Sequence, residues 1–152
     1  MNARLKVQNP ESDSGSPVFE EIPAEAVEDG LVRVLNSPVL VENLAADDII
    51  RAHADGSFEV VKRAGNICIQ FFRSKPPNIE VEQVLRSRVE DLGGRLDVRG
   101  GQFLVYTVPL RPAGFAAIEE PFNEAVGSSP DSSWMFGNVY DPVDGSPLNW
   151  WT

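Results

Sequence analysis

Short runs of alternating apolar and polar residues, separated by turn signals, are the feature that most limits how this 152-residue chain can fold. Five or six such runs lie between residues 17 and 73, and Asp55-Gly56 is one of the turn signals. Alternation with a period of two is typical of half-buried β-strands, and an Asp-Gly pair favours a tight hairpin. So many short strands predict a small β-barrel-like part, or a strongly bent sheet, over residues 17–65.

The pattern changes from residue 66 onward. Asn78 is the expected N-cap of an amphipathic helix, and Pro121 predicts a kink, or a break into two short pieces, in a later helical region. The expected elements are a strand, a helix, a hairpin, a second helical region and a strand, at residues 66–73, 78–94, 95–109, 113–127 and 132–140. The order β-α-β-β-α-β over residues 66–140 is that of a ferredoxin-like unit, so the predicted fold class is α+β.

The two ends of the chain differ from the middle in composition. Residues 1–16 are polar and contain Pro, Gly and Ser, which predicts a flexible tail. Residues 141–152 are acidic and aromatic and include Trp150 and Trp151. Burying an indole is worth on the order of 1.5–3 kcal/mol, so we expect this C-terminal tail to pack on the body, for example over an open end of the barrel-like part. The alternative is a mobile segment that binds a basic groove.

Charge is distributed unevenly along the chain, whose net charge is −10. Residues 11–59 carry twelve acidic and two basic side chains, residues 60–111 carry five and nine, and residues 112–152 carry six and none. An acidic surface repels phosphate groups, which argues against nucleic-acid binding and against anionic membranes. It would instead attract a basic partner protein. Solubility alone is the other explanation of this charge.

Composition also bears on compartment and cofactors. The hydrophobic fraction is 42%, which is ordinary for a globular core, and no apolar run approaches the length of a membrane span. The N-terminus shows no secretory signal. The one cysteine, Cys68, cannot form an intramolecular disulfide and lies in an apolar strand-like run, so we expect it to be buried. These observations predict a cytoplasmic protein without a bound cofactor.

The one histidine, His53, follows the pair Asp47 and Asp48 closely, and this is the strongest candidate for a catalytic or metal site. In a strand that starts near Asp48, however, His53 and Asp48 point to opposite faces. The chain has no second histidine, no CxxC pair, no GxSxG elbow and no phosphate-binding glycine loop. We therefore interpret the segment as a turn into a strand with an exposed histidine, and expect no catalytic residue and no metal.

Several short segments together resemble a bacterial family of uncharacterised function. The elements that carry the resemblance are Gly30 to Arg33, Asn36 to Pro38, Asp48 to Ile50 and Val60 to Asn66, followed by "LGGRLDV", "YTVP" and "SWMFG". The similarity covers residues 18–140, although Leu31 stands where the family usually has an aromatic residue. The resemblance implies a small β-barrel plus a ferredoxin-like unit and a bacterial source, and it implies no enzymatic activity.

These observations favour a non-enzymatic acidic binding protein. Our first hypothesis is an immunity or antitoxin protein that neutralises a basic toxin domain by direct binding. The residues expected to contact the partner are Glu28, Asp29, Asp47, Asp48, Asp141, Asp144, Trp150 and Trp151. The first alternative is a small-molecule-binding or regulatory module that uses the cleft between the two parts. The second is an enzyme that uses an unfamiliar carboxylate pair such as Asp47 and Asp48.

Overall fold

The structure, a computed structural model, describes residues 1–8, 15–75 and 78–152. The described part contains two antiparallel β-sheets and two helices, which confirms the predicted α+β class. The strands of the N-terminal sheet are β1 (Asn2–Lys6), β2 (Phe19–Glu28), β3 (Leu31–Val34), β4 (Ile49–Ala52) and β5 (Phe58–Lys62). The C-terminal sheet and its helices are β6 (Asn66–Arg73), α1 (Ile79–Asp91), β7 (Arg95–Arg99), β8 (Phe103–Pro109), α2 (Phe115–Ser128) and β9 (Ser132–Phe136).

The N-terminal sheet begins with a strand that the sequence analysis misses. Residues 1–16 are predicted to be a flexible tail, and this prediction is wrong for β1, which pairs antiparallel with β2 along its whole length. Ala3 and Leu5 are buried in the N-terminal core, whereas their neighbours in the strand are exposed. Burial of the apolar set on one face fixes the register of the strand. Residues 9–14 of the predicted tail lie outside the described residues.

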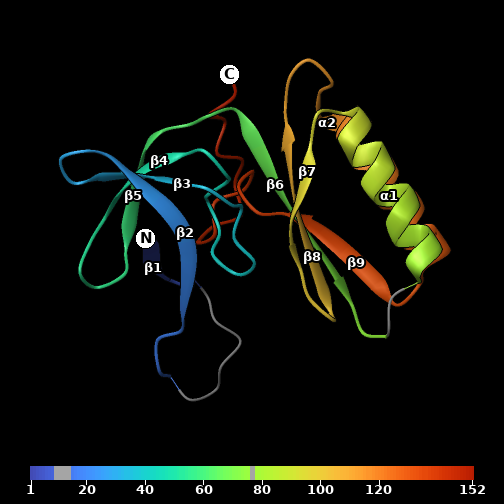
Figure 1. Cartoon of the computed structure of the whole chain (residues 1–152), viewed down its shortest axis with the longest axis horizontal. Helices are drawn as coiled ribbons and strands as arrows, with labels where there is room; N and C mark the ends of the chain where they lie inside the picture. The colour runs from blue at the N-terminus through green and yellow to red at the C-terminus, as the bar shows by residue number, and fades with distance from the viewer. Residues whose placement is uncertain (9–14, 76–77) are drawn as a thin grey trace.

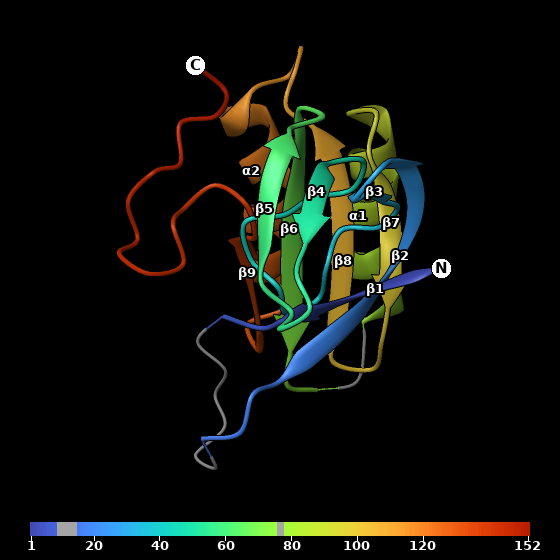
Figure 2. The same cartoon turned by 90° about the vertical axis from the view of Figure 1, so that its left-hand side faces the viewer.

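The five strands of this sheet follow the order β1-β2-β3-β4-β5. The sheet curls (Figure 2), so that β1 approaches the β4–β5 turn and the Lys6 N–H donates to the Gly56 carbonyl at 2.8 Å. Gly56 has a φ of +90°, and a Cβ there would lie 2.7 Å from the ring of Phe19, so only glycine fits this approach. No ladder joins β1 to β5 in the described part of the chain, and the sheet therefore remains open.

The C-terminal sheet has the order β7-β8-β6-β9, and both helices cover one of its faces (Figure 1). Asn78 caps α1 as predicted, because its side chain accepts hydrogen bonds from the backbone N–H groups of Glu80 and Val81. The predicted break at Pro121 is wrong: α2 continues through this buried residue, which removes only one backbone N–H from the helix. Neither helix in the described residues is long and apolar enough to span a bilayer.

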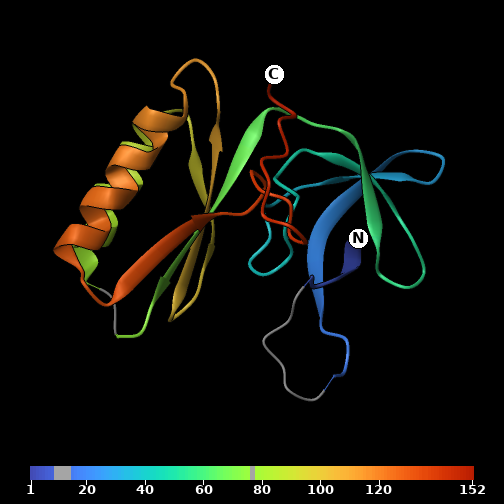
Figure 3. The ribbon, with the colours of Figure 1, turned by 180° about the vertical axis from the view of Figure 1, so that it is seen from behind.

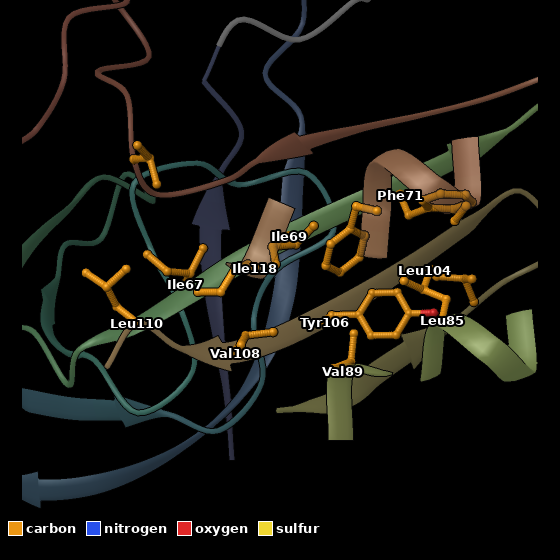
Figure 4. Close-up of a cluster of buried hydrophobic side chains, with 13 residues drawn as sticks. Ile67, Ile69, Phe71, Leu85, Val89, Leu104, Tyr106, Val108, Leu110 and Ile118 are labelled. Carbon is orange, nitrogen blue, oxygen red and sulfur yellow. The ribbon is translucent and has the colours of Figure 1, made fainter. Parts of the chain in front are cut away.

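Strand β6 contributes to the packing on both faces of the C-terminal sheet. Ile67, Ile69 and Phe71 point toward the helices and form part of the main core cluster (Figure 4). Cys68 and Gln70 point the other way and are also buried. The prediction that Cys68 is buried is confirmed, and desolvation raises the pKa of its thiol.

The face of the C-terminal sheet away from the helices is covered by the β3–β4 connection, residues 35–48. Ala45 of this connection packs on Cys68 and Val105 in a small cluster, and the Gln70 side-chain amide donates to the Pro38 carbonyl at 3.1 Å. The C-terminal sheet therefore lies in the middle of the molecule, between the helices and the N-terminal part (Figure 1).

Candidate functional site

Asp48, which the sequence analysis places on the partner-binding surface, is buried. It is 1% exposed. Its carboxylate accepts hydrogen bonds from the N–H groups of Ala45 (3.1 Å) and Ala64 (3.0 Å), and it lies 3.6 Å from the guanidinium of Arg63. Burial is the largest influence and raises the pKa of Asp48 to about 6. Direct contact between Asp48 and a partner is therefore excluded, and the prediction of such a contact is wrong.

The segment that contains His53 folds as expected. Ala46 and Asp47 form a turn that Asp48 closes by donating its N–H to the Ala45 carbonyl at 3.2 Å. Strand β4 starts at Ile49, and His53 is exposed just after β4, with its Nε2 3.9 Å from a Glu59 carboxylate oxygen. Asp47 is half-buried with a φ of +73°, a left-handed conformation that Asp adopts more readily than most residues. The described residues contain no group of three His, Cys, Asp or Glu side chains that could hold a metal ion.

The other acidic candidates belong to two separate regions. Glu28 and Asp29 are exposed at the β2–β3 turn. Asp141 and Asp144 lie in the segment after β9, where their carboxylates accept hydrogen bonds from nearby backbone N–H groups and so stabilise local turns. Figure 2 shows the β2–β3 turn and this C-terminal segment on different sides of the molecule. The predicted acidic residues therefore do not form one continuous surface.

Trp150 and Trp151 pack on the body of the protein, as the sequence analysis expects. Both are half-buried and contact the main core cluster of the C-terminal part, not an open end of the N-terminal sheet. The Trp150 indole N–H donates to the carbonyl of Asn138 at 2.8 Å, and Trp151 makes an edge contact with Phe115, with ring centroids 5.1 Å apart. These contacts fix the end of the chain.

A groove of about 290 Å³ follows the outer edge of β9. Figure 3 shows β9 as the outermost strand of its sheet. The groove is lined by three carboxylates and by four apolar or aromatic side chains: Glu42, Glu119, Asp141, Trp134, Met135, Phe136 and Tyr140. Met135 is 39% exposed and Tyr140 is 50% exposed, which is unusual for side chains of this size. We call this feature the β9 groove.

The backbone of β9 has unused hydrogen-bonding groups along this groove. Gly137 N–H donates to Cys68 O at 2.8 Å, so by the alternation of an antiparallel ladder Met135 also turns its backbone toward β6. Trp134 and Phe136 consequently turn their backbone N–H and C=O groups away from β6. These groups have no protein partner in the described part of the chain. The groove therefore offers a strand edge to which another strand could pair.

The carboxylates stand on both sides of this edge without a basic counter-ion. Glu119 comes from α2 on the helix face of the sheet, while Glu42 comes from the β3–β4 connection on the opposite face. Neither these two nor Asp141 forms an ion pair with any described Lys, Arg or His side chain. Partial burial raises the pKa of Glu42, so a nearby positive charge would stabilise its ionised form.

Sequence reasoning finds only part of this groove. It singles out Asp141 as a surface acid. Trp134 is partly buried against the main core cluster, and its indole N–H donates to Asn123 at 2.9 Å. Sequence reasoning misses Glu42 and Glu119, which are far from β9 in the sequence. The available signal is the segment from Trp134 to Asp141, which combines large apolar residues with one acid and has no basic residue. That β9 is an edge strand depends on the strand order of the folded sheet.

Comparison with known proteins supports the fold and leaves the activity open. A crystal structure of a hypothetical protein from Neisseria gonorrhoeae is similar to this chain, with a TM-score of 0.67 and 17% sequence identity, and the match covers 90% of this chain and 94% of that one. No curated protein matches the sequence. The model of a domain of unknown function, DUF4265, matches residues 20–129, in line with the resemblance to an uncharacterised family noted above. This protein is therefore a member of the DUF4265 family.

Proposed function

We propose that this protein is a non-enzymatic binding protein and that it holds an extended, basic segment of a partner protein along the free edge of β9. One observation carries the proposal: outward-facing backbone groups at Trp134 and Phe136 lie in a groove with exposed apolar side chains and three carboxylates that form no ion pair with the described residues. Extended peptides bind such edges by main-chain hydrogen bonds, and their side chains enter pockets beside the edge. The carboxylates would steer a cationic segment and pair with it.

A partner of opposite charge fits this groove better than a second copy of the chain. Pairing of β9 with β9 across a two-fold axis would bring Glu42, Glu119 and Asp141 of both copies to one interface. Like charges brought together in an interface cost several kcal/mol, as an order of magnitude. Residues 112–152 contain no basic side chain that could offset this repulsion.

Inhibition of a basic toxin domain is the role that we propose for such binding. The net charge of −10 would speed the encounter with a cationic enzyme, and aromatic and apolar side chains in the groove would anchor it. The exposed β2–β3 turn, with Glu28 and Asp29, is a second acidic surface that could contact the same partner. The experiment below separates the two surfaces.

The test measures binding of a short, labelled peptide that alternates Lys and Val, by fluorescence anisotropy at low and high salt. We expect saturable binding that weakens with salt, and a loss of at least about tenfold in affinity for Glu119→Lys. Asp29→Lys makes the same change of net charge at the other acidic surface and should leave affinity within about twofold. A peptide that alternates Glu and Val should not bind.

Hydrogen exchange separates strand pairing from general charge attraction. If the peptide extends the sheet, the amide protons of Trp134 and Phe136 become protected in the complex, because they donate to the added strand. Binding that protects neither amide, or that responds to Asp29→Lys and not to Glu119→Lys, would show that the β9 groove is not the site.

The alternative of an enzyme with a carboxylate pair receives no support from the geometry around Asp48. Its raised pKa is of the kind found at catalytic sites. However, both carboxylate oxygens already accept backbone hydrogen bonds, and the residue is 1% exposed, so no substrate can reach it. We interpret Asp48 as a structural residue.

We also propose the finer description of the fold that the sequence suggests, a barrel-like N-terminal part merged with a ferredoxin-like unit. The order β7-β8-β6-β9, with both helices on one face, supports the ferredoxin-like description of residues 66–136. The hydrogen bond from Lys6 to Gly56, which brings the first strand to the β4–β5 turn, supports the barrel-like description. An experimental structure compared with both fold classes tests these assignments.

A further inference from the structure

A second concave surface lies where β5 passes into β6, at the junction of the two parts. It is a pocket of about 400 Å³ whose lining includes Arg63, Gly65, Leu110, Arg111, Trp150 and Trp151. It shares no lining residue with the β9 groove. Pockets of this size, at a junction between structural units and with apolar walls and a few polar groups, are typical of small-molecule sites.

The charge of this pocket is opposite to that of the whole chain. Two guanidinium groups line it, and none of the lining residues is acidic. The Arg63 guanidinium is fixed by its partners, because it donates to the backbone and side-chain oxygens of Asn43 and lies 3.6 Å from the Asp48 carboxylate. Arg111 is exposed, and its side chain makes one hydrogen bond within the described residues, a long one of 3.4 Å to the carbonyl of Trp151.

These surroundings leave one uncompensated positive charge at the pocket. The charge of Arg63 is largely balanced by Asp48, whereas Arg111 has no carboxylate partner in the part of the chain that the structure describes. A guanidinium with free donors is well suited to a carboxylate, which it can hold with two parallel hydrogen bonds. The pocket is therefore matched to a ligand with one negative charge.

The walls of the pocket favour a flat, apolar body on that ligand. Trp150 is fixed by its hydrogen bond to the Asn138 carbonyl, and its ring lies 5.6 Å from the guanidinium carbon of Arg63, within cation–π range. Trp151 lies against it edge to face, with centroids 5.4 Å apart. Two indoles held in place in this way offer aromatic surface at little entropic cost on binding.

We propose that this pocket binds a small planar organic anion, an aromatic monocarboxylate, with Arg111 pairing the carboxylate and the two tryptophans contacting the ring. This inference is independent of the proposed function, since the β9 groove lies elsewhere on the molecule and takes a ligand of opposite charge.

The test is a calorimetric titration with 1-naphthoate at neutral pH. We expect saturable binding that weakens by about tenfold or more in Arg111→Gln, because the variant loses the charged pair. Arg51→Gln removes the same charge from an exposed position on β4 and is the matched control, with affinity within about twofold of the original. The neutral analogue 1-naphthylmethanol should bind weakly, as should inorganic phosphate and cyclohexanecarboxylate.

NMR of the three indole N–H groups locates the ligand. We expect the signals of Trp150 and Trp151 to shift with 1-naphthoate, while the signal of Trp134, which lies in the other groove, stays in place. The inference is overturned if 1-naphthoate gives neither heat nor these shifts. It is also overturned if Arg111→Gln binds as well as the unmodified chain, or if phosphate and cyclohexanecarboxylate bind equally well.

Discussion

One buried carboxylate connects two separate segments of this protein. Asp48, just before β4, accepts hydrogen bonds from Ala45 in the β3–β4 connection and from Ala64 after β5, and it faces Arg63. Desolvation opposes its ionised form, while the two N–H donors and the guanidinium favour that form. Desolvation is the larger influence, so the pKa rises to about 6 from an ordinary value of 3.8.

The pKa of Asp48 predicts how stability depends on pH. As pH rises from 3.8 to about 6, the unfolded chain releases this proton first, so the Asp48 contribution to the free energy of unfolding falls. The total fall is about 3 kcal/mol, as an order of magnitude. We therefore expect Asp48→Asn, which does not titrate, to destabilise the protein more at about pH 4 than at about pH 7. Urea unfolding at a series of pH values measures the difference.

The unmodified chain must be compared with the variant at each pH, because other carboxylates contribute to the free energy of unfolding with the opposite pH dependence. Hydrogen bonds lower the pKa of Asp55 and Asp144, so their contributions are lost as pH falls. Asp29→Asn, in an exposed turn, controls for the loss of one charge. A cost of Asp48→Asn that grows with rising pH would mean that the hydrogen bonds and Arg63 outweigh burial.

At the scale of elements, the sequence predicts those helices and strands whose structure depends on residues close to one another in the chain. The cap at Asn78 defines the start of α1, and the alternation in β7 and β8 around a glycine turn defines their hairpin. The strand β1 has the same alternation in Ala3 and Leu5, and Val7 continues it just after the strand, but its partner β2 lies beyond a polar stretch. A short alternating run does not form a stable strand until a partner strand pairs with it and one of its faces is buried.

The candidate site was less predictable than the elements. Trp134 and Asp141 stand out in the sequence, but the groove also needs Glu42 and Glu119 from distant segments. Asp48 illustrates the same limit, because its acidic side chain suggests a surface position and only the packing of the β3–β4 connection buries it. Contacts between residues far apart in the sequence determine both the composition of the β9 groove and the burial of Asp48.

The role of β1 leads to a prediction for Leu5. This side chain is fully buried in the N-terminal core, so Leu5→Ala should lower the free energy of unfolding by about 2–5 kcal/mol. Lys6→Ala, at the exposed neighbouring position, should cost less than about 0.5 kcal/mol. Chemical denaturation of both variants checks the difference. Equal stabilities of the two variants would mean that β1 contributes no more to stability than an exposed, unpaired segment.

At the scale of the whole molecule, buried polar side chains join the N-terminal part to the middle sheet. The Ala46 N–H donates to Ser37 Oγ at 3.0 Å, and Ser37 Oγ lies 2.6 Å from Thr107 Oγ1 on β8. Thr107 in turn donates to the Asp97 carboxylate on β7 at 2.5 Å, and the same oxygen accepts from the Ser37 N–H at 2.8 Å. Every member of this chain is paired, so the joint is specific as well as stable.

Thr107 lies at the centre of this joint, so a substitution that removes its hydroxyl tests the contribution of the buried hydrogen bonds. Thr107→Val keeps the shape of the side chain but removes one hydrogen-bond partner from the Ser37 hydroxyl and one donor from the Asp97 carboxylate, so we expect a loss of about 1–3 kcal/mol in unfolding free energy. Thr107→Ser keeps the hydroxyl and should cost less than about 1.5 kcal/mol.

Urea unfolding followed by both tryptophan fluorescence and far-UV circular dichroism measures this effect and tests whether the two parts unfold together. All three tryptophans belong to the C-terminal part, whereas strands of both sheets contribute to the circular dichroism signal. Because the β3–β4 connection packs directly on β6 and β8, we expect the two probes to give one coincident transition in the unmodified chain. If the joint holds the two parts together, Thr107→Val should shift the fluorescence and circular dichroism transitions to lower urea concentration. The two transitions either shift by the same amount or cease to coincide. A variant as stable as Thr107→Ser would instead mean that apolar packing around Cys68 alone holds the two parts together.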